Sequence, residues 1–336
     1  MKTKIKPTAE KSFTRNTLPF VLLFLAVTNL SFIPEGNCAN SFENNKEYAF
    51  KTSELIRTSL NECHSQVVWL DGIELQTAPL ICNFFEINDY QAVWTSGNEL
   101  TDQSVALIEL LKDSYKYGFE PSDFDIVSLE RFSHSLAKED KADKSALMRV
   151  RFEFLLTNSV FAFMSNLTQG TELSNAKNAF IFGNPLVSSF PKYLSEIKSA
   201  SEIIEQVLKL QPLDSEYTTL RNEMEVIISN MGTNNYSISV PDIDDDPKKV
   251  QNLFSYIFLK EGIISESVDL SDQAMFALML IEFQNLSGIR TTGNIDNATR
   301  RVVSQLVNTR YDEIAHRIEQ IRHRSIENEK LISFNH

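Results

Sequence analysis

The chain has 336 residues, of which 42% are hydrophobic and 23% charged, so its composition is that of a globular protein rather than a disordered chain. This length allows about two domains, and the small number of glycines, 10, disfavours Gly-rich phosphate-binding loops and collagen-like repeats. The net charge of −13 argues against non-specific binding to nucleic acid or anionic lipid, because phosphate groups are bound by basic surfaces.

The N-terminal segment has the layout of a secretory signal peptide. Basic residues up to Arg15 precede an apolar run, Leu18–Ile33, and small residues follow at Gly36–Ala39. The apolar run has 16 residues, fewer than the ~20 that span a bilayer comfortably. We therefore predict that residues 1–39 are removed on export, while an uncleaved anchor, which would add the membrane as a partner, stays open.

Export changes the interpretation of the three cysteines. Cleavage after Ala39 would remove Cys38 and leave Cys63 and Cys82, and an even pair in an oxidising compartment predicts one disulfide. Two buried thiols are the alternative. A nucleophilic Cys63 next to His64 is a third hypothesis, although sequence neighbours are seldom catalytic neighbours.

Apolar residues at helical spacing predict a mainly α fold up to residue 230. The clearest helix begins at an N-cap, Thr101 or Asp102, and ends at Gly118, with Pro121 confirming the stop. Before it, the sequence predicts a helix within residues 41–63 and a short strand or hairpin around Asp71-Gly72. A helical segment from Leu80 follows and ends on Tyr90 and Trp94, which we interpret as core residues. Further helices are predicted at Lys144–Leu167, closed by Gly170, and at Ser201–Leu210 and Ser215–Asn230.

A polar, acidic segment with two prolines then predicts a linker at residues 233–247. Three short helices, Pro247–Glu261, Ser271–Leu286 and Asp296–Leu306, are predicted beyond it, and a basic helix follows at Arg310–Ser325. The apolar positions expected on the first two of these helices are Val250, Leu253, Phe254 and Ile257, and then Ala274, Leu278, Ile281 and Phe283.

The three short helices resemble the peptidoglycan-binding domain of many cell-wall enzymes. The resemblance rests on the letters EFQ at Glu282–Gln284, SGI at Ser287–Ile289 and TGNIDNAT at Thr292–Thr299. The family usually writes the last motif as Asp-Gly-x-x-Gly-x-x-Thr, whereas this chain has Thr292 for the Asp and Asp296 for the second Gly. A tight turn that uses a positive φ at Gly293 is compatible with both changes.

The rest of the chain resembles the scaffold domain of the large periplasmic L,D-transpeptidases. The segments that carry the resemblance, in order, are Phe84–Trp94, Ala106–Ile126, Leu155–Glu172 and Leu208–Ile227, with the basic helix Arg310–Ser325 after the peptidoglycan-binding-like part. We therefore expect a mainly α chain with a signal peptide at 1–39, a scaffold domain at 40–232, a linker at 233–247, a three-helix domain at 248–307 and a basic helix and tail at 308–336.

Residues that would carry chemistry are missing from this pattern. The family's catalytic domain has a Ser-His-Gly-Cys-x-Arg signature, which these 336 residues do not contain. The five histidines have no metal-ligand spacing, and the acidic residues at 242–246 are interpreted as a solvated spacer. We predict no enzymatic activity, no catalytic residue, no metal and no cofactor.

The resemblance implies an exported, non-catalytic protein of the periplasm of a Gram-negative bacterium that binds peptidoglycan or a cell-wall enzyme, and not nucleic acid. A truncated L,D-transpeptidase that has lost its catalytic cysteine domain is the alternative. An enzyme that uses Cys63 or a carboxylate pair is a third hypothesis. The polar residues expected to contact a ligand are Gln284, Arg290, Thr292, Asn294 and Asn297.

Overall fold

The computed structural model describes residues 49–60, 68–70, 73–97, 99–136, 142–171, 184–234, 237–239, 246–266 and 270–334. Contacts divide the chain after Phe42, and all of these residues belong to the second unit, Glu43–His336. The predicted signal peptide, 1–39, lies outside the described residues. Among the helices that are described, none combines the length and the apolar character needed to cross a bilayer.

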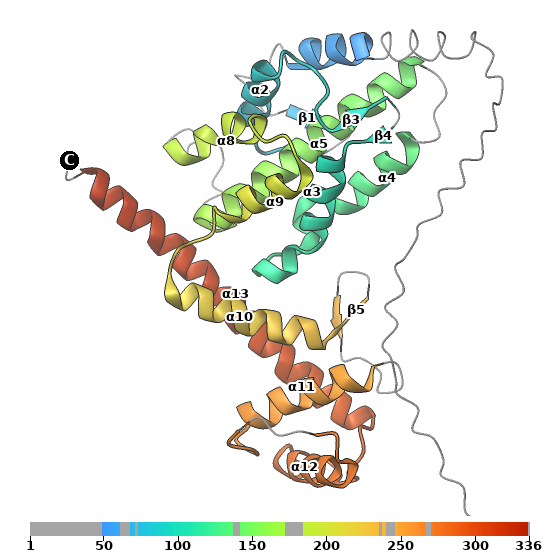
Figure 1. Cartoon of the computed structure of the whole chain (residues 1–336), viewed down its shortest axis with the longest axis vertical. Coiled ribbons are helices and arrows are strands. Elements are labelled where there is room, and N and C mark those ends of the chain that lie inside the picture. Colours follow the sequence, from blue (N-terminus) through green and yellow to red (C-terminus); the bar gives the residue numbers. More distant parts are fainter. Residues whose placement is uncertain are drawn as a thin grey trace, which may run out of the picture. The chain divides into compact units, whose positions relative to one another are not determined.

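The described chain is mainly helical, which confirms the predicted fold class (Figure 1). The N-terminal part begins with a helix at residues 49–60, the antiparallel strands β1 (Val68–Leu70) and β2 (Ile73–Leu75), and helix α2 (Ala78–Ile87). The paired strands β3 (Thr95–Ser96) and β4 (Glu99–Leu100) follow, and then helix α3 (Asp102–Lys112) and the 3-10 helices η1 (Ser114–Tyr117) and η2 (Pro121–Phe124). The remaining helices of this part are α4 (Ile126–Leu136), α5 (Ala142–Gln169), α8 (Pro185–Ser195), α9 (Ala200–Leu208) and α10 (Ser215–Asn230). The C-terminal part contains strands β5 (Gly232–Asn234) and β6 (Ser237–Ser239) and helices α11 (Pro247–Lys260), α12 (Gln273–Leu286) and α13 (Asn297–Phe334).

Most of the predicted elements are present. The strands β1 and β2 pair on either side of the predicted turn, α5 closes at Gly170 with a φ of 79°, and α10 has the predicted bounds. Helix α3 begins at the N-cap Thr101, whose hydroxyl accepts a hydrogen bond from the backbone N–H of Ser104. It ends earlier than predicted, because the chain tightens into η1 before Gly118 takes its left-handed conformation.

Several elements differ from the sequence-based predictions. Helices α4 and α8 were not predicted, and α8 begins at the N-cap Asn184 despite an internal proline, Pro191. The predicted linker contains the antiparallel pair β5–β6, and residues 240–245 lie outside the described part. The third short helix and the basic helix form one 38-residue helix, α13, because residues 307–309 hold neither Gly nor Pro to interrupt the backbone ladder.

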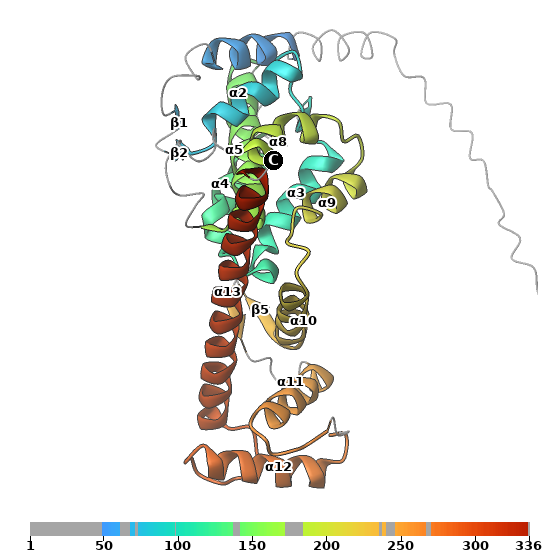
Figure 2. The same ribbon diagram turned by 90° about the vertical axis from the view of Figure 1, so that its left-hand side faces the viewer.

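The first of two apolar cores surrounds α5, which contacts α2, α3, α4 and α8 (Figure 2). Trp94 is 1% exposed and its ring stacks on Phe84 at 5.5 Å, so its prediction as a core residue is confirmed. Its indole N–H donates to the hydroxyl of Thr157 on α5 at 2.8 Å. Tyr90 packs against the same core and is partly buried.

The second apolar core joins α10 to α11, α12 and α13. Tyr217, Met224 and Ile227 of α10 are buried in it together with residues of the last three helices. Because α10 belongs to the predicted scaffold domain at 40–232, the packing does not follow the predicted boundary at the linker. The apolar side chains of α10 are covered by the helices that come after that linker.

Candidate functional site

Gln284 organises the turn before α13 instead of facing a ligand. Its side chain is 0% exposed, and its amide N–H groups donate to the hydroxyls of Thr292 (3.1 Å) and Thr299 (2.9 Å) and to the carbonyl of Asn294 (2.8 Å). Its amide oxygen accepts from the backbone N–H groups of Thr292 (2.7 Å) and Gly293 (2.9 Å). The prediction that Gln284 contacts a ligand is corrected, because its hydrogen-bonding groups are buried and used within the turn.

The other predicted ligand residues are more accessible. Arg290, Asn294 and Asn297 are exposed, and Thr292 is half-buried. The hydroxyl of Thr292 takes part in the turn and lies 3.3 Å from a carboxylate oxygen of Asp296, while the amide of Asn294 donates to the carbonyl of Thr292 at 3.1 Å. Arg290, Asn294 and Asn297 therefore remain candidates for contact with a ligand.

Asp296 caps the first turn of α13, as predicted. Its carboxylate accepts from the backbone N–H and from the hydroxyl of Thr299, both at 2.9 Å, and these bonds lower its pKa. Gly293 has a φ of 67°, and a Cβ there would lie 3.4 Å from the side chain of Ile281. Hydrogen bonds, a cap and a glycine thus hold the turn that precedes α13.

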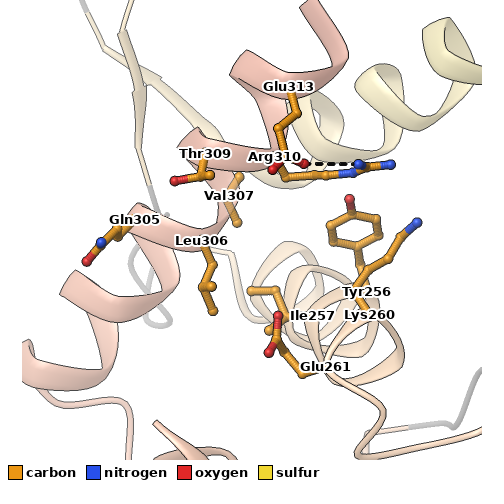
Figure 3. Close-up of a pocket in the computed structure, with 10 residues that line it drawn as sticks. All are labelled: Tyr256, Ile257, Lys260, Glu261, Gln305, Leu306, Val307, Thr309, Arg310 and Glu313. Carbon is orange, nitrogen blue, oxygen red and sulfur yellow. Dashed lines mark hydrogen bonds and ion pairs between the residues drawn. The ribbon is translucent and has the colours of Figure 1, made fainter. Parts of the chain in front are cut away.

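A groove with a volume of about 400 Å³ lies between α11 and α13 (Figure 3). Its floor is apolar, with Ile257 and Val307 almost completely buried and Leu306 pointing into the space. Figure 3 shows Tyr256 directed toward Arg310 at one end and Glu261 beside Ile257 at the other. The residues that line it are Tyr256, Ile257, Lys260, Glu261, Gln305, Leu306, Val307, Thr309, Arg310 and Glu313.

Glu223 of α10 lies next to Lys260 and Arg310 at one end of this groove. Its carboxylate oxygens accept from Arg310 at 3.0 and 2.9 Å, from Lys260 at 2.7 Å and from the hydroxyl of Tyr256 at 2.9 Å. Burial alone would raise the pKa of Glu223, but these hydrogen bonds and charges outweigh it and lower the pKa to about 2. The carboxylate therefore stays ionised at neutral pH and joins α10 to both α11 and α13.

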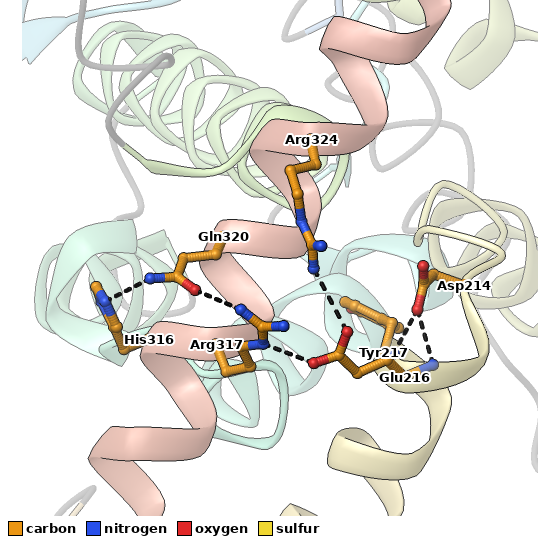
Figure 4. Close-up of polar contacts among 7 residues, drawn as sticks. All are labelled: Asp214, Glu216, Tyr217, His316, Arg317, Gln320 and Arg324. Carbon is orange, nitrogen blue, oxygen red and sulfur yellow. Dashed lines mark hydrogen bonds and ion pairs between the residues drawn. The ribbon is translucent and has the colours of Figure 1, made fainter.

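Helix α13 is also bound to α10 by polar side chains further along its length (Figure 4). The carboxylate of Glu216 on α10 pairs with Arg317 at 2.6 Å and with Arg324 at 3.4 Å. Gln320 lies between Arg317 and His316 and contacts both at 2.9 Å. These pairs are exposed, so each contributes little to the free energy of unfolding.

Arg322 of α13 makes buried polar contacts, unlike these exposed ion pairs. It is 0% exposed, and its guanidinium donates to the carbonyl of Tyr117 at 2.8 Å and to the hydroxyl of Tyr217 at 3.1 Å. The guanidinium carbon lies 4.2 Å from the ring centre of Phe119, a distance at which cation and ring attract each other. The basic helix thus reaches into the part of the chain that contains α3, η1 and η2.

Glu153 is a buried carboxylate in the centre of α5. It accepts from the backbone N–H groups of Val93 (2.9 Å) and Trp94 (3.0 Å) and from the hydroxyl of Thr95 (2.8 Å). Burial raises the pKa of Glu153 to about 7, and the hydrogen bonds from this loop limit the rise. Since the carboxylate holds the loop around Trp94 and is 0% exposed, its role here is structural.

The predicted disulfide is only partly described. Cys82 is 1% exposed and disulfide-bonded. Cys63 and His64 lie outside the described residues, so the pairing of Cys63 with Cys82 and the hypothesis of a nucleophilic Cys63 stay predictions. Of the acidic residues at 242–246, Asp246 is described, and its carboxylate accepts from the backbone N–H of Lys249 at the start of α11. In the described part of the chain, no group of three or more His, Cys, Asp or Glu is placed to hold a metal ion.

The family described as "Scaffold domain" has a sequence model that matches residues 79–224, from the first turn of α2 into α10. This stretch, residues 79–224, is similar to that family. The match agrees with the resemblance of this stretch to the scaffold of the L,D-transpeptidases. Neither the curated proteins nor the solved structures contain a significant match to the chain.

The groove and the ion pairs of Glu223 at one end of it were not predicted from the sequence. Glu223 falls inside the stretch that matches the scaffold family, and Arg310 lies 87 residues further on, so no local pattern connects them. The only indication in the sequence is that the segment starting at Arg310 is basic. The predicted ligand residues Arg290, Thr292 and Asn294 precede α13, and Asn297 is its first residue. The groove is built from α11 and a later part of α13.

Proposed function

We propose that this chain is an exported, non-catalytic cell-wall protein that binds peptidoglycan through its C-terminal helices and uses the scaffold domain to hold those helices. The observation that carries the proposal is the scaffold match at residues 79–224. The likeness of residues 282–299 to peptidoglycan-binding domains adds to it. A cell-wall enzyme is the second partner to test, because scaffolds of this kind accompany wall chemistry.

The packing supports a protein in which the two parts act together. Arg322 and Glu223 join α13 and α11 to α10 and to the segment around η1 through buried or half-buried contacts. Contacts of this kind make the C-terminal helices continuous with the scaffold domain instead of mobile beside it. A ligand that is bound by the turn or the groove would therefore be held in a defined place relative to the scaffold.

Wall binding is tested by co-sedimentation of residues 40–336 with purified peptidoglycan sacculi. We expect the protein to pellet with sacculi, and the triple variant Arg290→Ser, Asn294→Ala and Asn297→Ala to bind about tenfold more weakly, because all three side chains are exposed near the turn. Lys192→Ala, an exposed change on α8, is the matched control and should pellet like the unmodified chain. A chain that stays in the supernatant at every sacculus concentration would rule out direct wall binding and leave a wall enzyme as the ligand.

The absence of catalysis is tested on the same sacculi. After prolonged incubation with the chain, we expect the profile of peptidoglycan fragments released by a muramidase to be unchanged. A new cross-link or a trimmed stem peptide that disappears with Cys63→Ser would contradict the non-catalytic proposal. The periplasmic location is tested by fractionating cells that express the full chain.

A further inference from the structure

The groove between α11 and α13 has an apolar centre and a polar rim. Ile257 and Val307 form its buried floor, and Leu306 points into the space above them (Figure 3). Gln305 and Thr309 are exposed at its edge on α13. An apolar centre inside a solvent-accessible polar rim is the usual anatomy of a surface that binds another protein.

The dimensions of the groove limit what it can hold. Its volume is about 400 Å³, it is bounded by two helices, and it is open to solvent on one side. That space takes a few aliphatic side chains but not a folded element with its backbone. Apolar side chains that project at every third or fourth position from a partner helix enter grooves of this kind, because they lose contact with water there.

The charged groups beside the groove are negative in sum. Two cations and three carboxylates lie there, so one negative charge is in excess; they are Lys260, Arg310, Glu223, Glu261 and Glu313. Both cations bind Glu223, and Arg310 also binds Glu313 at 3.1 Å. Glu261 is exposed and forms no ion pair with any residue that the structure describes. The charge that remains for a partner is therefore that of a carboxylate.

The charge of the whole chain favours a basic partner as well. A net charge of −13 accelerates association with a positively charged protein. The same charge opposes the approach of a second copy of this chain and of an anionic membrane surface. The occupant that suits both the apolar floor and the charge is a basic amphipathic helix.

We propose that the groove between α11 and α13 is a docking site for an amphipathic helix of a basic protein partner. The apolar side chains of that helix lie on Ile257, Leu306 and Val307, and a lysine or arginine next to them pairs with Glu261. The site goes beyond the proposed function and does not depend on it, because none of the exposed residues proposed to contact the wall lines the groove.

The test uses residues 40–336 and, as the probe, a fluorescein-labelled, alanine-based helical peptide in a fluorescence anisotropy titration. Leucines recur in the peptide at every third or fourth position, and lysines flank them. We expect saturable binding, and about tenfold weaker binding when the order of residues is scrambled or the lysines are replaced by glutamates. Equal binding of the ordered and scrambled peptides, equal or stronger binding of the glutamate peptide, or no binding of the lysine peptide would overturn the proposal.

A variant at the edge of the groove makes the test specific to this surface. Thr309→Arg places a bulky cation there from an exposed position on α13, and should weaken binding of the lysine peptide about tenfold. Asn308→Arg, which makes the same change of charge at an exposed position outside the groove, is the matched control and should bind like the unmodified chain. An equal loss in both variants would show that the peptide responds only to the total charge, and would contradict docking in the groove.

Glu261→Gln tests the proposed charge pair. It should weaken binding of the lysine peptide about threefold, as expected for one exposed ion pair, and leave binding of a peptide with glutamines in place of the lysines unchanged. Glu282→Gln, an exposed change on α12, is the matched control. Lysine-peptide binding that is the same in Glu261→Gln and in the unmodified chain would contradict the pairing with Glu261.

Two further measurements separate this site from a second copy and from wall binding. In analytical ultracentrifugation without peptide, the unmodified chain and Thr309→Arg should sediment alike; a dimer that dissociates in Thr309→Arg but not in Asn308→Arg would assign the groove to a second copy and overturn the proposal. Thr309→Arg should pellet with sacculi like the unmodified chain while losing the peptide. A chain that binds the peptide but never pellets retains the groove and rejects wall binding.

Discussion

Glu223 is the residue through which charge contributes most clearly to the packing of the C-terminal helices. It accepts hydrogen bonds from two cations and one hydroxyl, and its pKa of about 2 reflects their sum. Gln284 acts in a similar way at the turn before α13, where one buried amide holds three residues of the backbone. Both side chains stabilise a particular arrangement of helices and turns that apolar burial alone would leave undetermined.

The substitution Glu223→Gln tests this role. We expect the free energy of unfolding to fall by about 2 kcal/mol at pH 7, because a neutral amide replaces a carboxylate that has charge-assisted hydrogen bonds. The folded-state pKa is lowered, so the contribution is fully present above the unfolded pKa of about 4.5 and is lost as pH falls toward 2.

The measurement is urea unfolding of both proteins between pH 7 and pH 3, with Glu225→Gln on the exposed side of α10 as the control. The difference between the unmodified chain and Glu223→Gln should shrink as the solution is acidified. A difference that stays constant with pH would show that packing, not charge, accounts for the loss.

Helix α13 shows how one element can join parts that look separate in the sequence. At a rise of 1.5 Å per residue its 38 residues extend about 57 Å, and it contacts both α10 and α5. Its first half contributes Val303 and Val307 to the second core, and its second half contributes the buried Arg322. The continuity of the helix between these halves is what connects the groove to the segment around η1.

Asn308→Pro tests that continuity at an exposed position in the middle of α13. We expect a loss of at least about 3 kcal/mol, because proline removes a backbone hydrogen bond and clashes with the preceding turn. Asn308→Ala, the control, should be neutral or slightly stabilising. Thermal unfolding followed by circular dichroism measures both, and a tolerated proline would indicate two helices with a break near residue 308, as the sequence had suggested.

At the scale of the molecule, the second apolar core is built from helices on both sides of the predicted domain boundary. Helix α10 begins inside the match to the scaffold domain, which ends at residue 224, but its apolar face packs with α11, α12 and α13. The end of α5 is also tied to α13, since the carboxylate of Glu319 accepts from the backbone N–H and the hydroxyl of Thr171. The C-terminal helices thus complete the packing of the part that precedes them.

A chain that ends at Asp246 should therefore fail to fold normally. It would expose Tyr217, Met224 and Ile227, each of which loses about 2 kcal/mol of burial, and it would lack Arg322 beneath Phe119. We expect aggregation in size-exclusion chromatography and a broadened urea transition, with residues 40–336 as the reference. A monomeric, cooperatively unfolding short chain would show that α10 is stable without the helices that cover it.

The positions of most helices and their caps could be predicted from local sequence, because these depend on residues within one or two turns. Thr101, Gly170 and Asp296 act where they were predicted to act. The apolar face of α11 was also correctly predicted, since its buried residues recur at helical spacing. The resemblance to a scaffold domain depended on ordered local motifs, and the match at residues 79–224 agrees with it.

Features that depend on the packing of distant segments could not be predicted from local patterns. Helix α12 has apolar residues on several sides, so their spacing along the sequence did not reveal which of them are buried. Leu278 and Ile281 are exposed, whereas Phe276 and Leu280 are buried. The partners of Glu223 and Arg322 are distant in sequence, and only the packing of whole helices brings them within hydrogen-bonding distance. For the same reason the groove, the continuity of α13 and the burial of Gln284 were visible only once the chain was folded.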